Sequence, residues 1–170
     1  MRFIPLSQSM VAVIDDADWD LISPYKWYAW KSRKGTGVYN ALRNIARPQH
    51  GTARMHVEVA RRKGIVGLVD HINGNGLDNR RGNLRLATTA QNMAAAPFYH
   101  SISGYRGVVL AKASGRFRAL IKSNQKQIVL GTFDTAEEAA RAYDQKALDL
   151  WGSFARTNFP VHDAPERMAA

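Results

Sequence analysis

The spacing of hydrophobic positions changes along the 170-residue chain, and these changes divide it into segments. Residues 1–50 contain short apolar runs, such as residues 10–14, that alternate with polar stretches. This pattern is typical of short strands, so we expect a strand-rich leader. Asp16 is placed to cap a short helix that carries Trp19 and Leu21. The aromatic side chains expected to anchor the core of the leader are Trp27, Trp30 and Tyr39.

Residues 51–97 combine helical and strand-like patterns. A helix is predicted over residues 53–63, and the glycine that follows is placed to end it. Residues 67–71 and 83–87 read as strands, and the stretch between them is a loop rich in Asn, Gly and Asp. A threonine directly after the second strand, Thr88 or Thr89, can cap a helix that reaches Asn92. The predicted order is strand, long loop, strand, helix.

Residues 98–104 read as a linker, and the chain then returns to an alternating pattern. Three strands are predicted over residues 105–112, 116–122 and 127–133. Thr135 and Glu138 have the spacing of a capping box, which predicts a helix after the third strand. The residues expected on the buried face of this helix are Ala136, Ala139, Ala140, Tyr143, Ala147 and Leu150.

Charge and composition narrow the class of partner and of metal. The chain has 24 Lys and Arg against 14 Asp and Glu, and this excess favours a polyanion such as nucleic acid, although a solubilising surface also accounts for it. The chain has no cysteine, so disulfides and thiolate zinc sites are excluded. Any metal would have oxygen or imidazole ligands, which suits Mg²⁺ or Mn²⁺.

No apolar run approaches the ~20 residues of a membrane span, and no signal-peptide pattern opens the chain. We therefore expect a soluble cytoplasmic protein with no membrane partner. No protein partner is implied.

One polar cluster could carry catalysis. Asp70 and His71 end a predicted strand, and Asn92 lies on the helix that follows the next strand. Phosphodiester hydrolysis needs a general base to activate water and a cation to absorb developing charge, and these side chains could supply both. A structural reading is open as well, because Asp, His and Asn also serve as turn and capping residues.

A longer motif favours the catalytic reading. Residues 70–85 have the pattern D-H-x-N-G-N-x-x-D-N-R-x-x-N-L-R, with Met55-His56 before it and Thr88-Thr-Ala-Gln-Asn92 after it. This stretch resembles HNH endonucleases, and within them the H-N-N subgroup of phage homing endonucleases. The resemblance implies a ββα-metal fold over about residues 66–95 and a phage as a fitting source.

The resemblance also implies roles for single residues. His71 would be the general base, and Asp70 and Asn92 would be ligands of one divalent metal ion, Mg²⁺ or Mn²⁺. Asn83 would stiffen the loop and help to orient the base. For His56 the resemblance suggests a role in holding the site or a phosphate, and a packed helix histidine is an equal alternative.

Basic side chains offer contacts to DNA. Arg80, Arg81 and Arg85 are candidate phosphate contacts, with solvated surface charge as the rival reading for Arg80 and Arg81. In the leader, Lys31, Arg33 and Lys34 could also reach DNA. In the strand over residues 116–122, alternation turns Phe117, Ala119 and Ile121 toward the helix and leaves the opposite face basic. That basic face consists of Arg116, Arg118 and Lys122, with Leu120 among them, and it could enter a DNA groove or simply be solvated.

The last unit carries a second set of motifs. They are Ser103-Gly-Tyr-Arg-Gly-Val108, Leu130-Gly-Thr-Phe133, Thr135-Ala-Glu-Glu-Ala-Ala140, Ala142-Tyr-Asp144 and Asn158-Phe159. They resemble the plant ethylene-response-factor (Apetala-type) DNA-binding domain over residues 103–160. The resemblance implies a three-stranded sheet that enters the major groove, with Arg106 and Lys122 among the DNA contacts. Val109, Phe117, Gln127 and Val129 depart from the family pattern, so the family's target sequence is not carried over.

Together these observations predict an α+β protein with a ββα-metal nuclease core and a C-terminal three-stranded antiparallel sheet packed on one helix. The expected divisions are a leader (1–50), a nuclease domain (51–97), a linker (98–104), a DNA-binding domain (105–160) and a tail (161–170).

The expected function is metal-dependent cleavage of double-stranded DNA by a homing-type endonuclease. The alternatives are a non-catalytic DNA-binding regulator with a degenerate nuclease fold and a nuclease directed at RNA or at special DNA structures.

Overall fold

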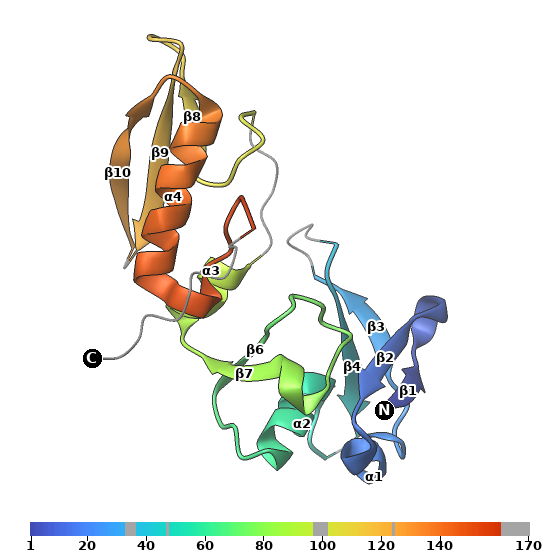
Figure 1. The fold of residues 1–170 in the computed structure, drawn as a ribbon. Coiled ribbons are helices and arrows are strands. Elements are labelled where there is room, and N and C mark those ends of the chain that lie inside the picture. The colour runs from blue at the N-terminus through green and yellow to red at the C-terminus, as the bar shows by residue number, and fades with distance from the viewer. Residues whose placement is uncertain (33–36, 47, 97–101, 124, 161–170) are drawn as a thin grey trace, which may run out of the picture. The chain divides into compact units, whose positions relative to one another are not determined.

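The computed structural model describes residues 1–32, 37–46, 48–96, 102–123 and 125–160. It divides into two compact units, Met1–Thr89 and Ala90–Ala170 (Figure 1). Both helices and antiparallel sheets are present, which confirms the predicted α+β class. Residues 98–101 of the predicted linker and the whole predicted tail, 161–170, lie outside the described residues.

The first unit contains small antiparallel sheets and short helices. Its strands are β1 (Arg2–Pro5), β2 (Val11–Ile14), β3 (Tyr28–Lys31), β4 (Tyr39–Ile45), β5 (Gly51–Arg54), β6 (Leu68–His71) and β7 (Leu84–Ala87). β1 pairs with β2, β4 lies between β3 and β5, and β6 pairs with β7. Its helices are α1 (Trp19–Ile22) and α2 (Met55–Arg62), with 3-10 turns at Ser7–Ser9, Asp16–Asp18 and Arg81–Asn83.

One hydrophobic core unites the leader with α2, β6 and β7. Leader side chains such as Ile14 and Trp27 pack in the same cluster as Val59 of α2, Val69 of β6 and Leu84 of β7. Burial of these side chains is the main favourable contribution to folding. The leader therefore supports the β6–β7 hairpin, which carries the candidate catalytic residues.

Three expectations for the leader are wrong in detail. Trp30 is 37% exposed and Tyr39 is half-buried, because the β3–β4–β5 sheet leaves one face open. Of these three aromatic residues, only Trp27 anchors the core. Asp16 does not cap the helix that carries Trp19 and Leu21, since Asp18 takes the capping position of α1. Asp16 lies in the preceding 3-10 turn and pairs with the N-terminal ammonium group and Arg2.

The predicted helix over residues 53–63 begins two residues late. Thr52, Ala53 and Arg54 pair with β4 as part of β5, so the helix starts at Met55 and ends at Arg62. The positive φ of Gly64 fits its role just beyond this helix. Sheet pairing with a distant strand outweighed the local helical pattern here.

The second unit contains a three-stranded antiparallel sheet under one long helix. Its elements are α3 (Thr89–Ala95, which begins at the last residue of the first unit), β8 (Val108–Ala111), β9 (Arg116–Ser123), β10 (Lys126–Phe133), α4 (Ala136–Trp151) and a 3-10 turn at Gly152–Phe154. The sheet order is β10-β9-β8, and α4 lies across one face of it (Figure 1). No helix among the described residues is long and apolar enough to span a membrane.

Helix α4 confirms the predicted capping box. The Thr135 hydroxyl accepts a hydrogen bond from the Glu138 amide at 3.2 Å, and the Glu138 carboxylate accepts one from the Thr135 amide. Ala139, Ala140, Tyr143 and Ala147 are buried against the sheet as predicted. The prediction that Leu150 is buried is wrong, because its side chain is exposed and Trp151 packs in the core instead.

The first strand of this sheet starts later than predicted, at Val108. The reason is local: Gly107 has a φ of +74°, and the Arg106 amide donates to the Asn158 side chain rather than to a neighbouring strand. A β-carbon at position 107 would lie 2.0 Å from the Tyr143 ring, so this site requires glycine.

Candidate active site and nucleic-acid interface

The β6–β7 hairpin brings Asp70 and His71 to the end of a strand. In the antiparallel register Asp70 lies opposite Arg85, and His71 lies opposite Leu84. Asp70 is buried, and its Oδ2 accepts a hydrogen bond from Arg85 Nε at 2.9 Å. Arg85 Nη2 lies 2.8 Å from the same oxygen. Arg85 therefore fixes the orientation of the Asp70 carboxylate.

The His71 ring is held by an asparagine of the following loop. His71 Nε2 lies 3.3 Å from Asn79 Oδ1, and Asn79 is fully buried. Asn79 Nδ2 donates to the Leu77 carbonyl at 3.1 Å and to Met55 Sδ at 3.4 Å, which orients its amide with Oδ1 toward the histidine. Because an amide oxygen can only accept, Nε2 carries the proton and Nδ1 of the neutral ring is the basic atom.

A second histidine packs against His71. The His56 ring on α2 meets the His71 ring edge to face, with 4.8 Å between centroids. His56 is 8% exposed, and its Nδ1 has no hydrogen-bond partner among the described residues. Burial, then the neighbouring His71 and then Arg54 lower the pKa of His56 to about 3. This ring is therefore a neutral, packed neighbour of the candidate base.

The pKa of His71 is also lowered, chiefly by burial. The hydrogen bond with Asn79 and the charges of Asp70 and Asp78 oppose this shift. The ring is therefore neutral at neutral pH and can accept a proton, as a general base must.

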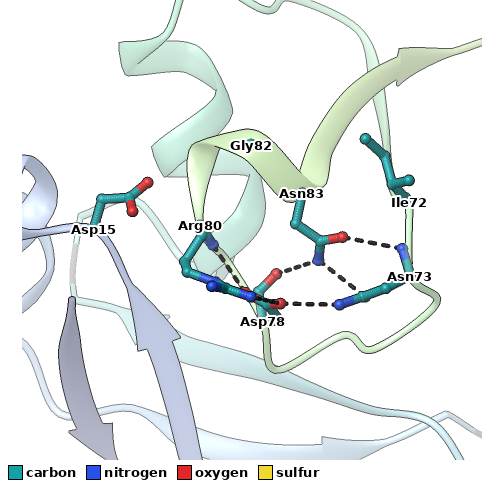
Figure 2. A pocket seen from close by; sticks show the side chains of 7 residues that line it. All are labelled: Asp15, Ile72, Asn73, Asp78, Arg80, Gly82 and Asn83. Atoms are coloured by element: carbon teal, nitrogen blue, oxygen red, sulfur yellow. Dashed lines mark hydrogen bonds and ion pairs between the residues drawn. The ribbon is translucent and has the colours of Figure 1, made fainter.

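Asn83 stabilises the loop between the two strands. Its Oδ1 accepts from the Asn73 amide at 3.0 Å, and its Nδ2 donates to the Asp78 carbonyl at 2.7 Å and to Asn73 Oδ1 at 3.0 Å. These side chains border a hollow of about 380 Å³ (Figure 2). The lining residues are Asp15, Ile72, Asn73, Asp78, Arg80, Gly82 and Asn83. The side chain that bonds to His71 belongs to Asn79, so the orienting contact expected of Asn83 is made by another loop asparagine.

Each arginine of this motif is paired with an aspartate. Arg80 binds both carboxylate oxygens of Asp78, which lowers the pKa of that carboxyl, and Arg85 binds Asp70. Arg81 binds the fully buried Asp18 at 2.7 and 2.8 Å across 63 residues of sequence. Arg80 and Arg81 are thus neither simple solvated charges nor uncommitted phosphate contacts, since both also hold the loop in place.

Asn92, the other expected metal ligand, lies half-buried on α3 and belongs to the second compact unit. No group of three His, Asp or Glu side chains that could hold a metal occurs within the described ranges. The expected donors are a carboxylate and a carboxamide oxygen, which suit Mg²⁺ or Mn²⁺ and leave most coordination positions for water and phosphate. The residues present therefore fit a hard divalent ion.

The exposed face of the second unit's sheet is basic. Arg116, Arg118 and Lys122 alternate along β9 and are exposed, while Ala119 and Ile121 between them are buried. Arg116 pairs with Asp134 at 2.8 Å. Among the described residues, Arg118 and Lys122 have no ion pair, so both charges are available to an anionic partner.

Arg106 is bound within its own unit. Its Nε donates to the Tyr143 hydroxyl at 2.8 Å, and its Nη1 donates to the Ala96 carbonyl at 2.8 Å just after α3. Nη2 adds a longer contact of 3.4 Å to the Met93 carbonyl. A DNA contact by Arg106 would have to replace these bonds, and it stays a prediction.

Two leader candidates, Arg33 and Lys34, lie outside the described residues. Lys31 lies over the Tyr39 ring at 5.9 Å. The sequence did not single out Asn79 as a support for the base. Its place in the motif, one residue after Asp78, was the available signal, but only the fold shows that its side chain turns inward.

Comparisons with known proteins agree with both features, the candidate site on the β6–β7 hairpin and the basic sheet of the second unit. Residues 67–94 match the family model "HNH endonuclease", and residues 103–153 match the model "AP2 domain". An ethylene-responsive transcription factor of Medicago truncatula is 55% identical over 56 residues, which cover 32% of this chain and 18% of that protein. An AP2-like ethylene-responsive transcription factor of Arabidopsis thaliana is 43% identical over 67 residues, 34% of this chain and 14% of that protein.

A viral protein matches across both units. An uncharacterized HNH endonuclease of Acanthamoeba polyphaga mimivirus is 30% identical over 140 residues, which cover 82% of this chain and 70% of that protein. The matches to these two plant factors cover about a third of this chain and at most 18% of their own length. The motif residues on the β6–β7 hairpin and the length of the viral match lead to one conclusion: this chain belongs to the HNH endonuclease family and carries an AP2 domain.

Proposed function

We propose that this protein is a homing-type endonuclease that uses one Mg²⁺ or Mn²⁺ ion and nicks duplex DNA positioned by its AP2 domain. The observation that carries the proposal is the neutral His71 ring, held through Nε2 by buried Asn79 beside the Asp70 carboxylate. A buried imidazole in a fixed tautomer next to an oriented carboxylate suits general-base hydrolysis.

The proposed reaction is hydrolysis of one phosphodiester bond. Nδ1 of His71 takes a proton from water, and the water oxygen forms a bond to phosphorus. The bond between phosphorus and the 3′ oxygen breaks, and the departing oxygen takes a proton from solvent. Asn79 holds the base in the tautomer that carries its proton on Nε2, and His56 excludes water from one side of the ring.

Asp70 and Asn92 would hold the metal ion within a ββα-metal core. The bound ion would stabilise negative charge on the phosphate and on the leaving oxygen. Arg85 positions the Asp70 carboxylate, and its use as a DNA contact is secondary to that pairing. Asn83 acts by stiffening the loop that carries Asn79.

The AP2 domain would bring this site to DNA. The exposed cations Arg118 and Lys122, together with Arg116, would contact phosphates and base edges. With one HNH site in the chain, a monomer is expected to cut one strand, and a double-strand break would need two events.

The test is cleavage of a supercoiled plasmid bearing candidate targets, in Mg²⁺, in Mn²⁺ and in EDTA. Wild type should convert the plasmid to open circles only with metal. His71→Ala should lower the rate at least about a hundredfold, because a general base contributes that much or more. His50→Ala, which removes an exposed histidine of the same unit, is the matched control and should cut normally. Full activity in His71→Ala would refute the assigned base.

The similarity to plant transcription factors favours one second candidate, a DNA-binding regulator that does not cut. This alternative predicts tight, sequence-specific binding to duplex DNA and no metal-dependent cleavage of the bound site. The plasmid assay on a bound sequence separates the two functions.

A further inference from the structure

The exposed face of the AP2 sheet carries cations on its central strand, β9, and exposed valines on its outer strands, β8 and β10. Strand register places Val109 opposite Arg118, and Val129 opposite Leu120. Val109 is 43% exposed and Val129 is 57% exposed, whereas Leu120 is half-buried. Val109 thus lies beside Arg118, whereas Leu120 and Val129 lie in the next outward row, between Arg118 and Lys122.

This combination restricts what the face can bind. Solvent-exposed valines in a sheet contribute little to stability unless a partner covers them, and the cations on the strand between them favour an anionic partner. A polyanion that also presents apolar groups meets both conditions. In the major groove of DNA the thymine C5-methyl group is such an apolar feature. The same groove presents the guanine acceptors that arginine recognises.

We infer that Val109 and Val129 of the AP2 sheet select thymine by contact with its methyl group, and that Arg118 reads a guanine between them. The two valines lie on the outer strands, β8 and β10, on either side of β9. The valines are separated by two strand spacings of about 4.8 Å across the sheet and by two residues of about 3.4 Å along it, which is about 12 Å in total. At a base-pair rise of about 3.4 Å, the selected thymines should be about three to four base pairs apart. This inference rests on the proposed DNA-binding role of the sheet and adds its sequence preference.

The experiment starts from the full chain in EDTA, where DNA can be bound without being cut. Duplexes enriched from a random library define the preferred site. In that site each thymine is then replaced singly by deoxyuridine, which keeps the base pair and removes only the methyl group. Affinity should fall about fourfold at the contacted positions, the value expected for one buried methyl group.

Substitution of the valines ties the effect to the residues. Val129→Ser and Val109→Ser should each remove the preference for thymine over deoxyuridine at one position and leave the other position unchanged. Val66→Ser is the matched control, because Val66 is 81% exposed and lies in the other unit. Equal melting temperatures, and equal binding to random DNA at low salt, show that the variants are folded.

The outcomes separate this inference from the proposed function. An enriched site at which no deoxyuridine changes affinity would overturn the thymine contact and leave DNA binding intact. No enriched sequence at all would overturn both the contact and the positioning role of the AP2 domain. Loss of the methyl effect in Val66→Ser as well would assign it to something other than the sheet.

Discussion

Two histidine rings in contact, His56 and His71, form the centre of the candidate active site. Neither has an acidic side chain bound to its ring among the described residues, so protonating either ring would place a charge beside the other in a buried position. The arrangement keeps both rings neutral, which the base requires. It also makes the first unit sensitive to acid.

The first prediction concerns the pH dependence of stability. The pKa of His56 is about 3 in the folded protein and about 6.5 in an unfolded chain, so the unfolded state binds the proton between these values. The stabilisation from this group is present above pH 6.5 and is lost as pH falls toward 3. Between pH 7.5 and pH 5 the free energy of unfolding should fall by about 2 kcal/mol through His56 alone.

Urea denaturation of wild type and His56→Gln at both pH values measures this contribution. The variant should lose about that much of the pH dependence, and His50→Gln, which removes an exposed histidine of the same unit, is the matched control. An unchanged pH dependence in His56→Gln would contradict the buried, neutral state of this ring.

At the scale of elements, the buried carboxylate of Asp144 on α4 connects two AP2 motifs that are separate in the sequence, Ala142-Tyr-Asp144 and Asn158-Phe159. Asp144 accepts hydrogen bonds from the Asn158 amide and side chain at 2.8 to 2.9 Å, and from the Phe159 amide at 3.0 Å. The Asn158 side chain in turn binds both backbone groups of Arg106. One aspartate thus connects α4, the segment after it and the turn that leads into β8.

The second prediction is that Asp144→Ala destabilises the AP2 unit by about 3 kcal/mol. The substitution leaves several buried or half-buried donors without their charged acceptor, and each such loss costs about 1 to 3 kcal/mol. Asp149→Ala removes an exposed aspartate from the same helix and should change the melting temperature very little. Equal stability of the two variants would argue against this network.

At the scale of the whole molecule, the net charge of +10 favours binding to DNA, but the fold decides which cations take part. The motif arginines of the first unit are committed to aspartates, as Arg81 is to Asp18. Arg118 and Lys122 are exposed and without ion pairs among the described residues. A formal charge therefore overstates the number of phosphate contacts.

The third prediction follows from this distribution. A plot of log affinity against log salt concentration should become shallower by about one for Arg118→Ala and for Lys122→Ala. Lys146→Ala, on the helix that covers the other face of the sheet, should leave the slope unchanged. Filter binding between about 50 and 200 mM salt gives the slopes. If the two sheet variants keep the wild-type slope, this face does not contact phosphates.

Local patterns in the sequence determined much of this protein. A short apolar run predicted β6, alternation predicted β7 and the inward-facing side of β9, and the Thr135–Glu138 spacing predicted the start of α4. The motif at residues 70–85 identified Asp70 and His71. These features depend on neighbours within a few residues, which is why a single sequence contains them.

Only the tertiary structure decided which distant residues meet. It placed Asn79 rather than Asn83 on the base, joined Asp18 to Arg81, gave the leader and the β6–β7 hairpin one core, and bound Arg106 to Tyr143. It also left Trp30 exposed, although the residue type favours burial. The physical reason is that burial and hydrogen-bond partners are set by segments far apart in the chain, whose approach no local pattern encodes.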